Sequence, residues 1–563
     1  MNQDPHKSVF DVIVVGSGAS GGWAAKRLSE AGLKVALVEA GRAHTEDDYR
    51  EHRAPFDLKF RDRVTAHIQR TRPVQSGAGC DEYNYDWFLN DLEEPYTTGK
   101  DKPFRWIGRT RITGGRTNIW GRHSYRLSDL DFKAASHDGY GADWPLGYQD
   151  LAPYYDIVDR YVGVCGRPEG LEQLPDGNLQ PSMNMTCTET LLRNRVKEKL
   201  GWTVTSGRVA NLTRAINGRA PCHYCGPCHR GCATRSYFNA AFTTVADAMA
   251  TGNCTHVPNA MVYQVLMDRE RNRARGALYV DRVSRQVREI RGRSVVLAAQ
   301  ALESVRVLLN SANPSYPNGL ANSSGVLGHY LMDHTWVAGG ATGEFPGLDG
   351  RPSLDQPVRP NGLYVVRFRN TMKGPRWKDF LRGYGFQGGA ATSFNWKAPG
   401  FGEAYKKALL EPVNTLALGG FGECLARWDN FVELDPSVKD IFGIPVVRIH
   451  MTWGDNEHAM IDDMAVTAAQ MLEVAGAKDI TPFAAHDRTP GLGIHEVGVA
   501  RMGNDPKTSV LNQFQQTHDI KNLFVVDGAG FTSSACQNPT LTIMALCVRS
   551  CDHLMGELKR GNI

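Results

Sequence analysis

The segment FDVIVVGSGASGGWAAKRLSEAGLKVALVEAGR, residues 10–42, constrains the fold of this chain more than any other. Residues 10–15 form an apolar run that suits a buried parallel strand. Three glycines follow in G-x-G-x-x-G spacing, and residues 24–31 have the spacing of an amphipathic helix. A second apolar run, residues 35–38, ends at Glu39. This order predicts a strand, a helix and a second parallel strand that together bind a dinucleotide.

The three glycines each have a physical task in this interpretation. Gly16 permits a tight turn, Gly18 lets the backbone approach a pyrophosphate, and Gly21 lets the helix pack closely against the strand. The helix N-terminus, where Ser20 lies, offers N–H groups and partial positive charge to the phosphates. Glu39 is placed to accept hydrogen bonds from a ribose hydroxyl. The segment predicts dinucleotide binding but does not decide between FAD and NAD.

Four further segments carry patterns of their own. A Gly-Gly pair lies among arginines in residues 108–126, and residues 294–311 predict a buried strand followed by a helix. Residues 493–503 form a glycine-rich stretch that contains a histidine. Residues 522–550 predict a strand, an Asp-Gly turn, a long loop and a helix that begins near Pro539.

Together these segments resemble the glucose–methanol–choline (GMC) oxidoreductases over nearly the whole chain. The resemblance implies a two-lobed α/β (α+β) fold, in which a Rossmann-like FAD-binding domain is assembled from discontinuous segments beside a sheet-based substrate-binding domain. It implies FAD as the cofactor and an alcohol or sugar hydroxyl as the hydride donor. We expect an FAD-binding domain at 1–334 with inserted substrate-lobe elements and a cysteine loop at 221–233, a substrate-binding domain at 335–490, and a return to the FAD-binding domain at 491–563.

The resemblance also implies which residues meet the FAD. Asp527 and Gly528 would meet the ribityl chain or the pyrophosphate, and Asn118 would lie near the isoalloxazine. Pro539 and Thr540 would open a helix whose dipole stabilises the anionic reduced flavin. The expected cofactor-binding residues are Gly16, Gly18, Ser20, Gly21, Glu39, Arg111, Gly114, Gly115, Asn118, Trp120, Val262, Asp527, Gly528, Pro539 and Thr540.

Two positions depart from the pattern of the family. Some relatives attach the FAD covalently to a histidine just before the tryptophan that corresponds to Trp120. Here that position is Ile119, which excludes covalent attachment through residue 119. The Ala-Ala-Gly that usually follows the strand is Ala298, Ala299 and Gln300 in this chain.

Oxidation of an alcohol by FAD requires removal of the hydroxyl proton and transfer of a hydride from carbon to flavin N5. A histidine suits the first task because its ordinary pKa lies near neutrality. A second polar group must orient the hydroxyl. Members of the family place a His, and a second His or Asn, in the two C-terminal motifs. The resemblance therefore makes His495 the candidate base and Asn538 its orienting partner.

Four cysteines crowd into the stretch PCHYCGPCHRGC. Their C-x2-C-x2-C-x3-C spacing matches a ferredoxin-type run, although Ala233 replaces the proline that usually follows. Structural zinc more often uses two separated C-x-x-C pairs, so the spacing favours an iron–sulfur cluster. Zinc, a disulfide and free thiols are the alternatives. An iron–sulfur cluster (3Fe-4S or 4Fe-4S) would carry electrons from the reduced flavin outward. The candidate ligands are Cys222, Cys225, Cys228 and Cys232.

The cysteine loop also bears on partners and location. A subset of bacterial sugar dehydrogenases in the family has such a loop. By resemblance to them we expect a small subunit that carries an export signal, and a cytochrome as electron acceptor. The N-terminal sequence MNQDPHKSVFDVIVVGSG lacks the pattern of a signal peptide. We therefore expect export to the periplasm together with the partner, with a cytoplasmic location as the alternative.

The favoured substrate is a sugar or glycoside, oxidised at ring C3 or C1. An O2-using oxidase of the same family and a non-catalytic flavoprotein scaffold are the alternatives, while an NADPH-fed monooxygenase would need a second dinucleotide motif that the sequence lacks. A net charge of +4 with interspersed charges gives no indication of nucleic-acid binding. The longest apolar stretches, such as residues 294–302, have about half the ~20 residues of a membrane span. We expect no membrane-spanning segment.

Overall fold

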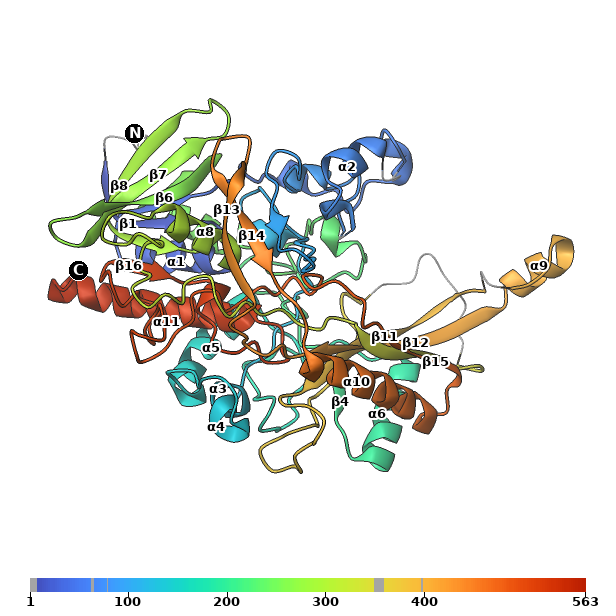
Figure 1. Ribbon diagram of the computed structural model, residues 1–563. Helices are drawn as coiled ribbons and strands as arrows, with labels where there is room; N and C mark the ends of the chain where they lie inside the picture. Colours follow the sequence, from blue (N-terminus) through green and yellow to red (C-terminus); the bar gives the residue numbers. More distant parts are fainter. Residues whose placement is uncertain (1–7, 62–64, 78, 349–358, 396–397) are drawn as a thin grey trace.

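The N-terminal segment lies in the middle of a seven-stranded sheet (Figure 1). Its strands are β1 (Val9–Val15), β2 (Val35–Val38), β5 (Cys254–Val257), β6 (Ala260–Asp268), β7 (Arg273–Asp281), β8 (Val287–Leu297) and β16 (Leu523–Val525). Their order is β5–β2–β1–β8–β7–β6, with β16 beside β8. The computed structural model describes residues 8–61, 65–77, 79–348, 359–395 and 398–563.

Strand β8 joins two kinds of pairing in this sheet. Its residues 291–297 pair in parallel with β1, and its residues 287–291 pair antiparallel with β7. Its last residues, 295–297, pair in parallel with β16, which comes from near the C-terminus. The C-terminal motifs thus return to the sheet that the N-terminal motif began. This agrees with a nucleotide-binding lobe assembled from discontinuous segments.

Helices cover this sheet and close its core. They are α1 (Ala19–Glu30), α5 (Tyr148–Val162), α7 (Thr244–Ala250), α8 (Ala301–Asn310) and α11 (Thr540–Arg560). Helix α1 packs against α7 and α11, and α11 also packs against α5. Buried apolar side chains of strands and helices, among them Ile13, Val296 and Met544, form one continuous core.

The turn between β1 and α1 has room for no side chain at two glycines. A Cβ atom on Gly21 would lie 1.8 Å from the carbonyl oxygen of Gly16. Gly16 has a φ of +96°, and a Cβ atom there would lie 2.5 Å from the carbonyl oxygen of Ala298. Helix α1 therefore starts in direct contact with β1 and with the end of β8, as the glycine spacing predicts.

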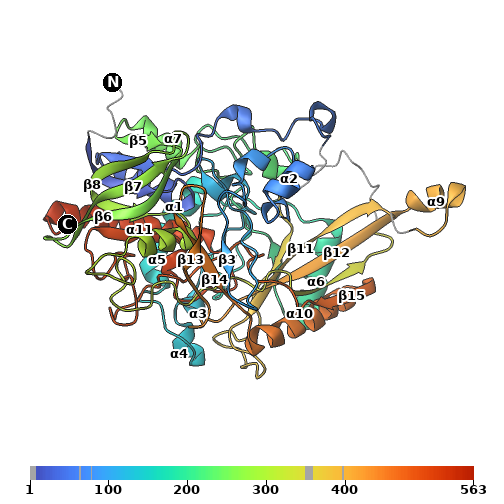
Figure 2. The ribbon, with the colours of Figure 1, turned by 45° about the horizontal axis from the view of Figure 1, so that its top comes forward.

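A six-stranded sheet forms the second lobe (Figure 2). In spatial order its strands are β15 (Lys478–Ala484), β9 (Gly339–Glu344), β12 (Pro412–Gly422), β11 (Tyr384–Phe394), β10 (Leu363–Val365) and β4 (Val204–Ser206). Helices α6 (Cys187–Leu200) and α10 (Asp455–Val474) pack against it. Buried side chains such as Leu192, Phe386 and Met464 form a second core.

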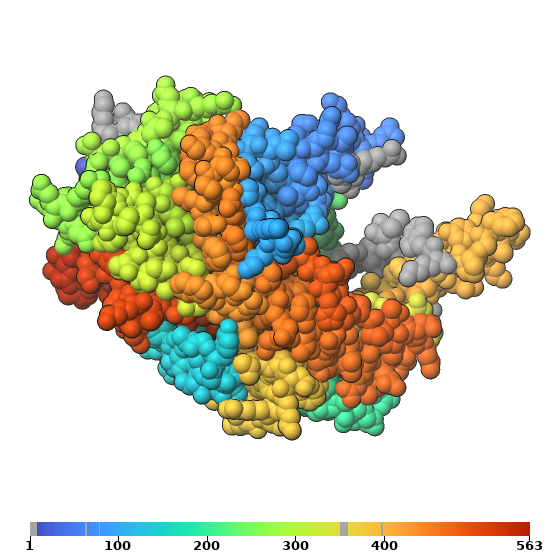
Figure 3. All heavy atoms as spheres, in the orientation of Figure 1, coloured from blue at the N-terminus to red at the C-terminus, as the bar shows by residue number. Residues whose placement is uncertain are grey.

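The outer part of the β11–β12 hairpin extends away from both lobes. It carries α9 (Gly402–Leu409) at its tip, and Figure 3 shows this arm projecting beyond the rest of the molecule. Phe401 and Leu410 at the tip are 91% and 66% exposed. The inner parts of the same two strands pair with β10 and β9, so only the outer part of the hairpin stands apart.

A small third sheet lies beside the first lobe. Its strands are β3 (Thr97–Thr98), β13 (Phe431–Lys439) and β14 (Pro445–His450). Helix α8 packs against β13 and β14, whose residues Val432, Val447 and Ile449 belong to the first core. The remaining helices are α2 (Ala66–Thr71), α3 (Asp129–Phe132) and α4 (Ala134–Asp138).

The two-lobed α/β fold that the sequence predicts is confirmed. The residues expected to form the substrate-binding domain, 335–490, supply most of the second sheet, while α6 and β4 join it from earlier in the chain. Strands β13 and β14 come from the same range but pack on the first lobe. In the part of the chain that the structure describes, no helix has the length and apolar character needed to cross a bilayer.

The glycine contact at the start of α1 yields a stability prediction. Gly21→Ala should lower the melting temperature because the new methyl group meets a backbone oxygen that cannot move independently. Overpacking of this kind costs about 1–3 kcal/mol. Gly556→Ala is the matched control inside α11, where the nearest atoms belong to the flexible Arg560 guanidinium. It should gain up to about 1 kcal/mol from helix propensity. Equal melting temperatures for the two variants would contradict the close contact.

Candidate functional site

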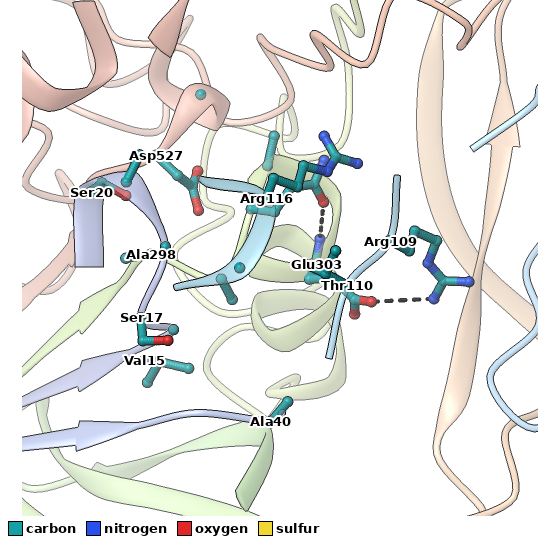
Figure 4. A pocket seen from close by; sticks show the side chains of 18 of the residues that line it. Val15, Ser17, Ser20, Ala40, Arg109, Thr110, Arg116, Ala298, Glu303 and Asp527 are labelled. Atoms are coloured by element: carbon teal, nitrogen blue, oxygen red, sulfur yellow. Dashed lines mark hydrogen bonds and ion pairs between the residues drawn. The ribbon is translucent and has the colours of Figure 1, made fainter. Parts of the chain in front are cut away.

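A pocket of about 1420 Å³, its open mouth included, lies at the carboxyl ends of β1, β2, β8 and β16 (Figure 4). Open α/β sheets bind ligands in this position. Figure 4 shows side chains from the β1 turn (Ser17, Ser20), from the end of β16 (Asp527) and from the arginine-rich segment (Arg116) around the same space. The lining residues named from the sequence are Gly16, Gly18, Ser20, Glu39, Arg111, Gly115, Trp120, Val262, His495, Asp527, Gly528, Pro539 and Thr540.

Four of the named residues do not line the pocket but contact residues near it. Gly21 makes the contact between α1 and β1, and the main-chain N–H of Gly114 donates to the Ser17 hydroxyl at 2.9 Å. Asn118 is fully buried, and its Nδ2 donates to the carbonyl of Gly115 at 2.8 Å. Asn118 therefore braces the Gly-Gly turn. Asn538 lies beside His495, with its Nδ2 atom 3.4 Å from Nε2 of that ring.

The start of α1 has the features of an anion site. Gly18 is the N-cap of the helix, and no side chain of the described residues caps it. The first turn contains no acidic residue, and residues 18–20 line the pocket. The positive end of the helix dipole therefore faces the pocket, where phosphate groups would be stabilised.

Glu39 closes the turn after β1 from the side of β2. Its carboxylate accepts the main-chain N–H and the hydroxyl of Ser17, at 3.0 and 2.6 Å, and the main-chain N–H of Gly41 at 2.6 Å. The side chain is 7% exposed and lines the pocket. A carboxylate has about four acceptor positions, so one is left for a ligand hydroxyl.

Arg111 lines the pocket, but its guanidinium is held by two carboxylates. It donates to Glu94 at 2.8 Å and to Glu303 at 2.8 Å, and Arg109 also donates to Glu303 at 3.3 Å (Figure 4). Burial alone would raise the pKa of Glu303, but Arg111, Arg306 and Arg109 hold that pKa well below its usual range. These side chains form a buried ion-pair network in the pocket wall.

Gln300 explains how the chain departs from the Ala-Ala-Gly pattern. It adopts a φ of +87°, a conformation that favours glycine. Its Oε1 accepts the N–H groups of Leu302 and Glu303 at 3.1 and 3.3 Å, so it caps α8. Its Nε2 donates to Glu496 at 3.1 Å, and Arg116 donates to the same carboxylate at 2.6 and 3.1 Å. The glutamine joins the turn after β8 to the C-terminal motif.

The structure brings His495 and Asn538 together. The Nε2 atom of His495 lies 3.4 Å from Nδ2 of Asn538, and the Oδ1 atom of Asn538 accepts from Nε2 of Gln387 at 2.6 Å. Gln387 belongs to β11 of the second lobe. The two residues from the C-terminal motifs thus meet at the junction of the lobes.

Two further residues, Asp333 and His334, complete this group and were not predicted from the sequence. The Nδ1 atoms of His495 and His334 lie 3.0 Å apart, and His334 is 1% exposed. Asp333 accepts the main-chain N–H groups of His334, His495 and Gly493 at 2.8, 3.1 and 3.2 Å. An Asp-His pair directly after an apolar Leu-Met pair, at the expected domain boundary, was the sequence pattern that could have indicated them.

Burial sets the protonation of these histidines. It lowers the pKa of His334 to about 4. Burial, followed by the charges of His334, Arg116 and His123, lowers the pKa of His495 well below 6.5. Both imidazoles are therefore neutral at pH 7. Burial and the neighbouring Glu496 raise the pKa of Asp333 to about 7.

Asp333, His334 and His495 also have ligand atoms within 4.8 Å of one another, which could suit a metal ion. The carboxylate of Asp333 is already used by three main-chain N–H groups, and the two Nδ1 atoms face each other at hydrogen-bond distance. We therefore interpret the group as a hydrogen-bonded cluster.

The four cysteines are free thiols in one loop. Main-chain N–H groups donate to two of the sulfurs, from Tyr224 to Cys222 at 3.4 Å and from Ser236 to Cys232 at 3.2 Å. Among the described residues, no three of these sulfurs lie within 4.8 Å of one another. Tetrahedral zinc with bonds of 2.3 Å would bring its sulfurs to about 3.8 Å. The loop is therefore more open than a closed zinc site.

A buried tyrosine connects the cysteine loop with the pocket wall. The Tyr237 hydroxyl donates to the carbonyl of Asn118 at 2.9 Å, and the residue is 1% exposed. Burial raises the pKa of Tyr237, and the nearby Cys232 contributes to that rise. Beside it, Trp120 lines the pocket and donates to the carbonyl of Phe238 at 3.0 Å. The segment after the loop thus packs directly behind the pocket.

The chain is similar in sequence to a known protein family and to characterised relatives. Two sequence models described as GMC oxidoreductase match residues 10–336 and 426–547. The 2-methyl-1,2-propanediol dehydrogenase of Mycolicibacterium austroafricanum is 31% identical, with 97% of this chain and 95% of that protein covered. The fructose dehydrogenase large subunit of Gluconobacter japonicus is 28% identical, with 98% of each chain covered.

The fold also matches solved structures. Pyridoxine 4-oxidase from Mesorbium loti superimposes with a TM-score of 0.63 at 18% identity, with 97% of this chain and 99% of that one covered. At this level of identity the match bears on the fold alone.

Proposed function

Because this chain belongs to the GMC oxidoreductase family, we propose that it is an FAD-dependent dehydrogenase that oxidises a hydroxyl of a sugar or glycoside, at ring C3 or C1, to a carbonyl. The observation that carries this proposal is the meeting of His495 and Asn538 beside a dinucleotide pocket. Two relatives named as dehydrogenases of a diol and of fructose support a hydroxyl substrate.

The residues present fit FAD. The uncapped start of α1 would hold the pyrophosphate, and Glu39 retains an acceptor position for a ribose hydroxyl. Ile119 lies outside the pocket lining and has no nucleophilic atom, so we propose non-covalent binding with respect to this residue. When bound, FAD supplies the acceptor for the hydride that leaves the substrate carbon.

The residues of the chain then handle the hydroxyl. Neutral His495 would take the hydroxyl proton on Nε2, the atom that faces Asn538. Asn538 would donate its Nδ2–H to the same oxygen and fix the direction of the C–H bond. Gln387 orients the Asn538 amide from the second lobe, so the substrate would lie where the two lobes meet.

We also propose that the cysteine loop binds an iron–sulfur cluster that leads electrons away from the pocket. The loop offers four free thiols, N–H groups directed at two sulfurs and a spacing wider than zinc needs. A polynuclear cluster suits wider spacing because its cysteines bind different iron atoms. Tyr237 and Asn118 join the loop to the pocket wall.

The acceptor of these electrons belongs to the proposal as well. One relative is named as a large subunit, which supports a partner subunit here. We propose that such a partner carries the export signal, that a cytochrome receives the electrons, and that the assembled enzyme works in the periplasm.

His495→Ala tests the base. The variant should bind FAD normally, because the α1 turn and Glu39 are unchanged, yet substrate should reduce the FAD at least ~10²-fold more slowly. FAD absorbance followed under anaerobic conditions with D-glucose, D-fructose, methyl α-D-glucoside and 1,2-propanediol measures this. His67→Ala, an exposed histidine on α2, is the control and should behave as wild type. Normal reduction in the His495 variant would remove the residue from the mechanism.

The lowered pKa of His495 predicts a pH profile. His495 must be neutral to accept a proton, and burial favours the neutral ring. His495 should therefore stay neutral as pH falls from 8 to 6.5, and the loss of rate that its protonation causes should begin only below pH 6.5. Stopped-flow measurements across pH 4.5–8.5 would locate this limb in the wild type and in Asp333→Asn, because burial raises the Asp333 pKa to about 7. An acid limb at or above pH 6.5 that persists in Asp333→Asn would argue against a buried neutral base.

Cys225→Ser tests the cluster. The variant should lose iron and the EPR signal, while reduction of the FAD by substrate continues and transfer to an added one-electron acceptor slows. Cys187→Ser, an exposed cysteine outside the loop, is the control and should keep its iron. Metal analysis that found zinc and no iron in the wild-type protein would refute the cluster.

A further inference from the structure

A buried contact behind the candidate base extends the proposed function and rests on it. We propose that His334 is a positioning residue that accepts the Nδ1–H of His495 and so keeps the lone pair of His495 on Nε2, toward the substrate. His334 lies behind the histidine, away from the pocket lining. It would act through His495 without touching the substrate.

The contact between the two rings requires one donor and one acceptor. Their Nδ1 atoms are 3.0 Å apart, with the ring centroids at 4.8 Å and the planes at 82°. Both rings are buried and neutral, so each carries a single N–H proton. One histidine must therefore hold its proton on Nδ1 and the other must hold it on Nε2.

The contacts of Asn538 decide which ring is the donor. Gln387 donates to Oδ1 of Asn538, so the amide presents its Nδ2–H to Nε2 of His495. If Nε2 of His495 carried a hydrogen, that N–H would point at the Nδ2–H of Asn538. Nε2 of His495 must therefore carry a lone pair. The proton of His495 is then on Nδ1, and the Nδ1 atom of His334 accepts it.

The fold fixes His334 in this role. The segment around residue 334 runs between the lobes, since Met332 pairs with Val497 and His334 pairs with Glu423. Asp333 binds the main-chain N–H groups of both His334 and His495. The two rings are therefore held by the backbone on both sides of the hydrogen bond.

Proton balance follows from this arrangement. When the substrate O–H bond breaks, the new N–H bond forms on Nε2 of His495, which becomes an imidazolium. Its Nδ1–H stays in the hydrogen bond with His334, and no proton passes to His334. The hydrogen bond becomes charge-assisted at this moment and is strengthened. Loss of the acceptor should thus slow the chemical step more than substrate binding.

Two substitutions separate this role from packing. His334→Asn keeps an acceptor oxygen close to the place of Nδ1, whereas His334→Leu removes it with similar bulk. We expect kcat to fall about tenfold or more in the leucine variant, with KM within about twofold, because one transition-state hydrogen bond is lost. The asparagine variant should recover most of kcat. The measurements are kcat and KM with an added one-electron acceptor and the sugar that reduces the wild type fastest, with anaerobic FAD reduction and melting temperatures recorded in parallel.

The outcomes are distinguishable. His67→Leu and His67→Asn, on the exposed face of α2, are matched controls and should keep wild-type kcat. If His495→Ala is slow but His334→Leu is as fast as wild type, the inference about His334 fails while the proposed function stands. If His495→Ala is as fast as wild type, the assignment of His495 as the base fails as well. Equal losses in the asparagine and leucine variants would indicate packing and overturn the proposal.

Two further measurements address misfolding of the leucine variant and a bound metal ion. His334→Met removes the acceptor with a flexible side chain and replaces the leucine variant if that protein does not fold. EDTA should leave the wild-type rate unchanged. A loss with EDTA that added zinc restores in both the wild type and the Cys225→Ser variant would assign Asp333, His334 and His495 to a metal and contradict the hydrogen bond.

Discussion

The close contact between α1 and the first strand is the constraint on which the rest of the molecule depends. With no side chain at Gly16 and Gly21, the helix starts against β1 and the end of β8. This contact directs the helix dipole to the carboxyl ends of the strands, where the chain gathers Glu39 and the turns after β8 and β16. The pocket is therefore a direct consequence of backbone packing.

Hydrogen bonds, and not apolar packing alone, join the distant segments around this pocket. Gln300 connects the turn after β8 with the C-terminal motif through Glu496. Gln387 reaches Asn538 from the second lobe, and Asp333 ties the inter-lobe segment to the loop of His495. Buried polar groups need partners, so each of these contacts fixes the position of a segment as well as a side chain. Catalytic geometry and lobe arrangement thus depend on the same bonds.

Sequence patterns, with the family resemblance that they carry, indicated most of the pocket because its parts are local. The strand–glycine–helix segment, the Gly-Gly pair and the two C-terminal motifs each predict their own conformation, and 12 of the 15 expected cofactor-binding residues line one pocket. Asn118 is still predicted to lie beside the flavin, and the structure adds that its side chain braces the Gly-Gly turn. Arg111 lines the pocket but is held by Glu94 and Glu303. Side-chain partners far along the chain decide such details, and sequence spacing does not reveal them.

The sequence by itself determined the order of strands and helices, the need for glycine at the nucleotide turn and the presence of a His and an Asn in the last motifs. These features follow from short-range backbone geometry and chemistry. Only the tertiary structure decided that His334 and Gln387 meet His495 and Asn538, because these contacts join segments of two lobes across long stretches of chain. Burial in that junction, which no local pattern encodes, is also what keeps both histidines neutral.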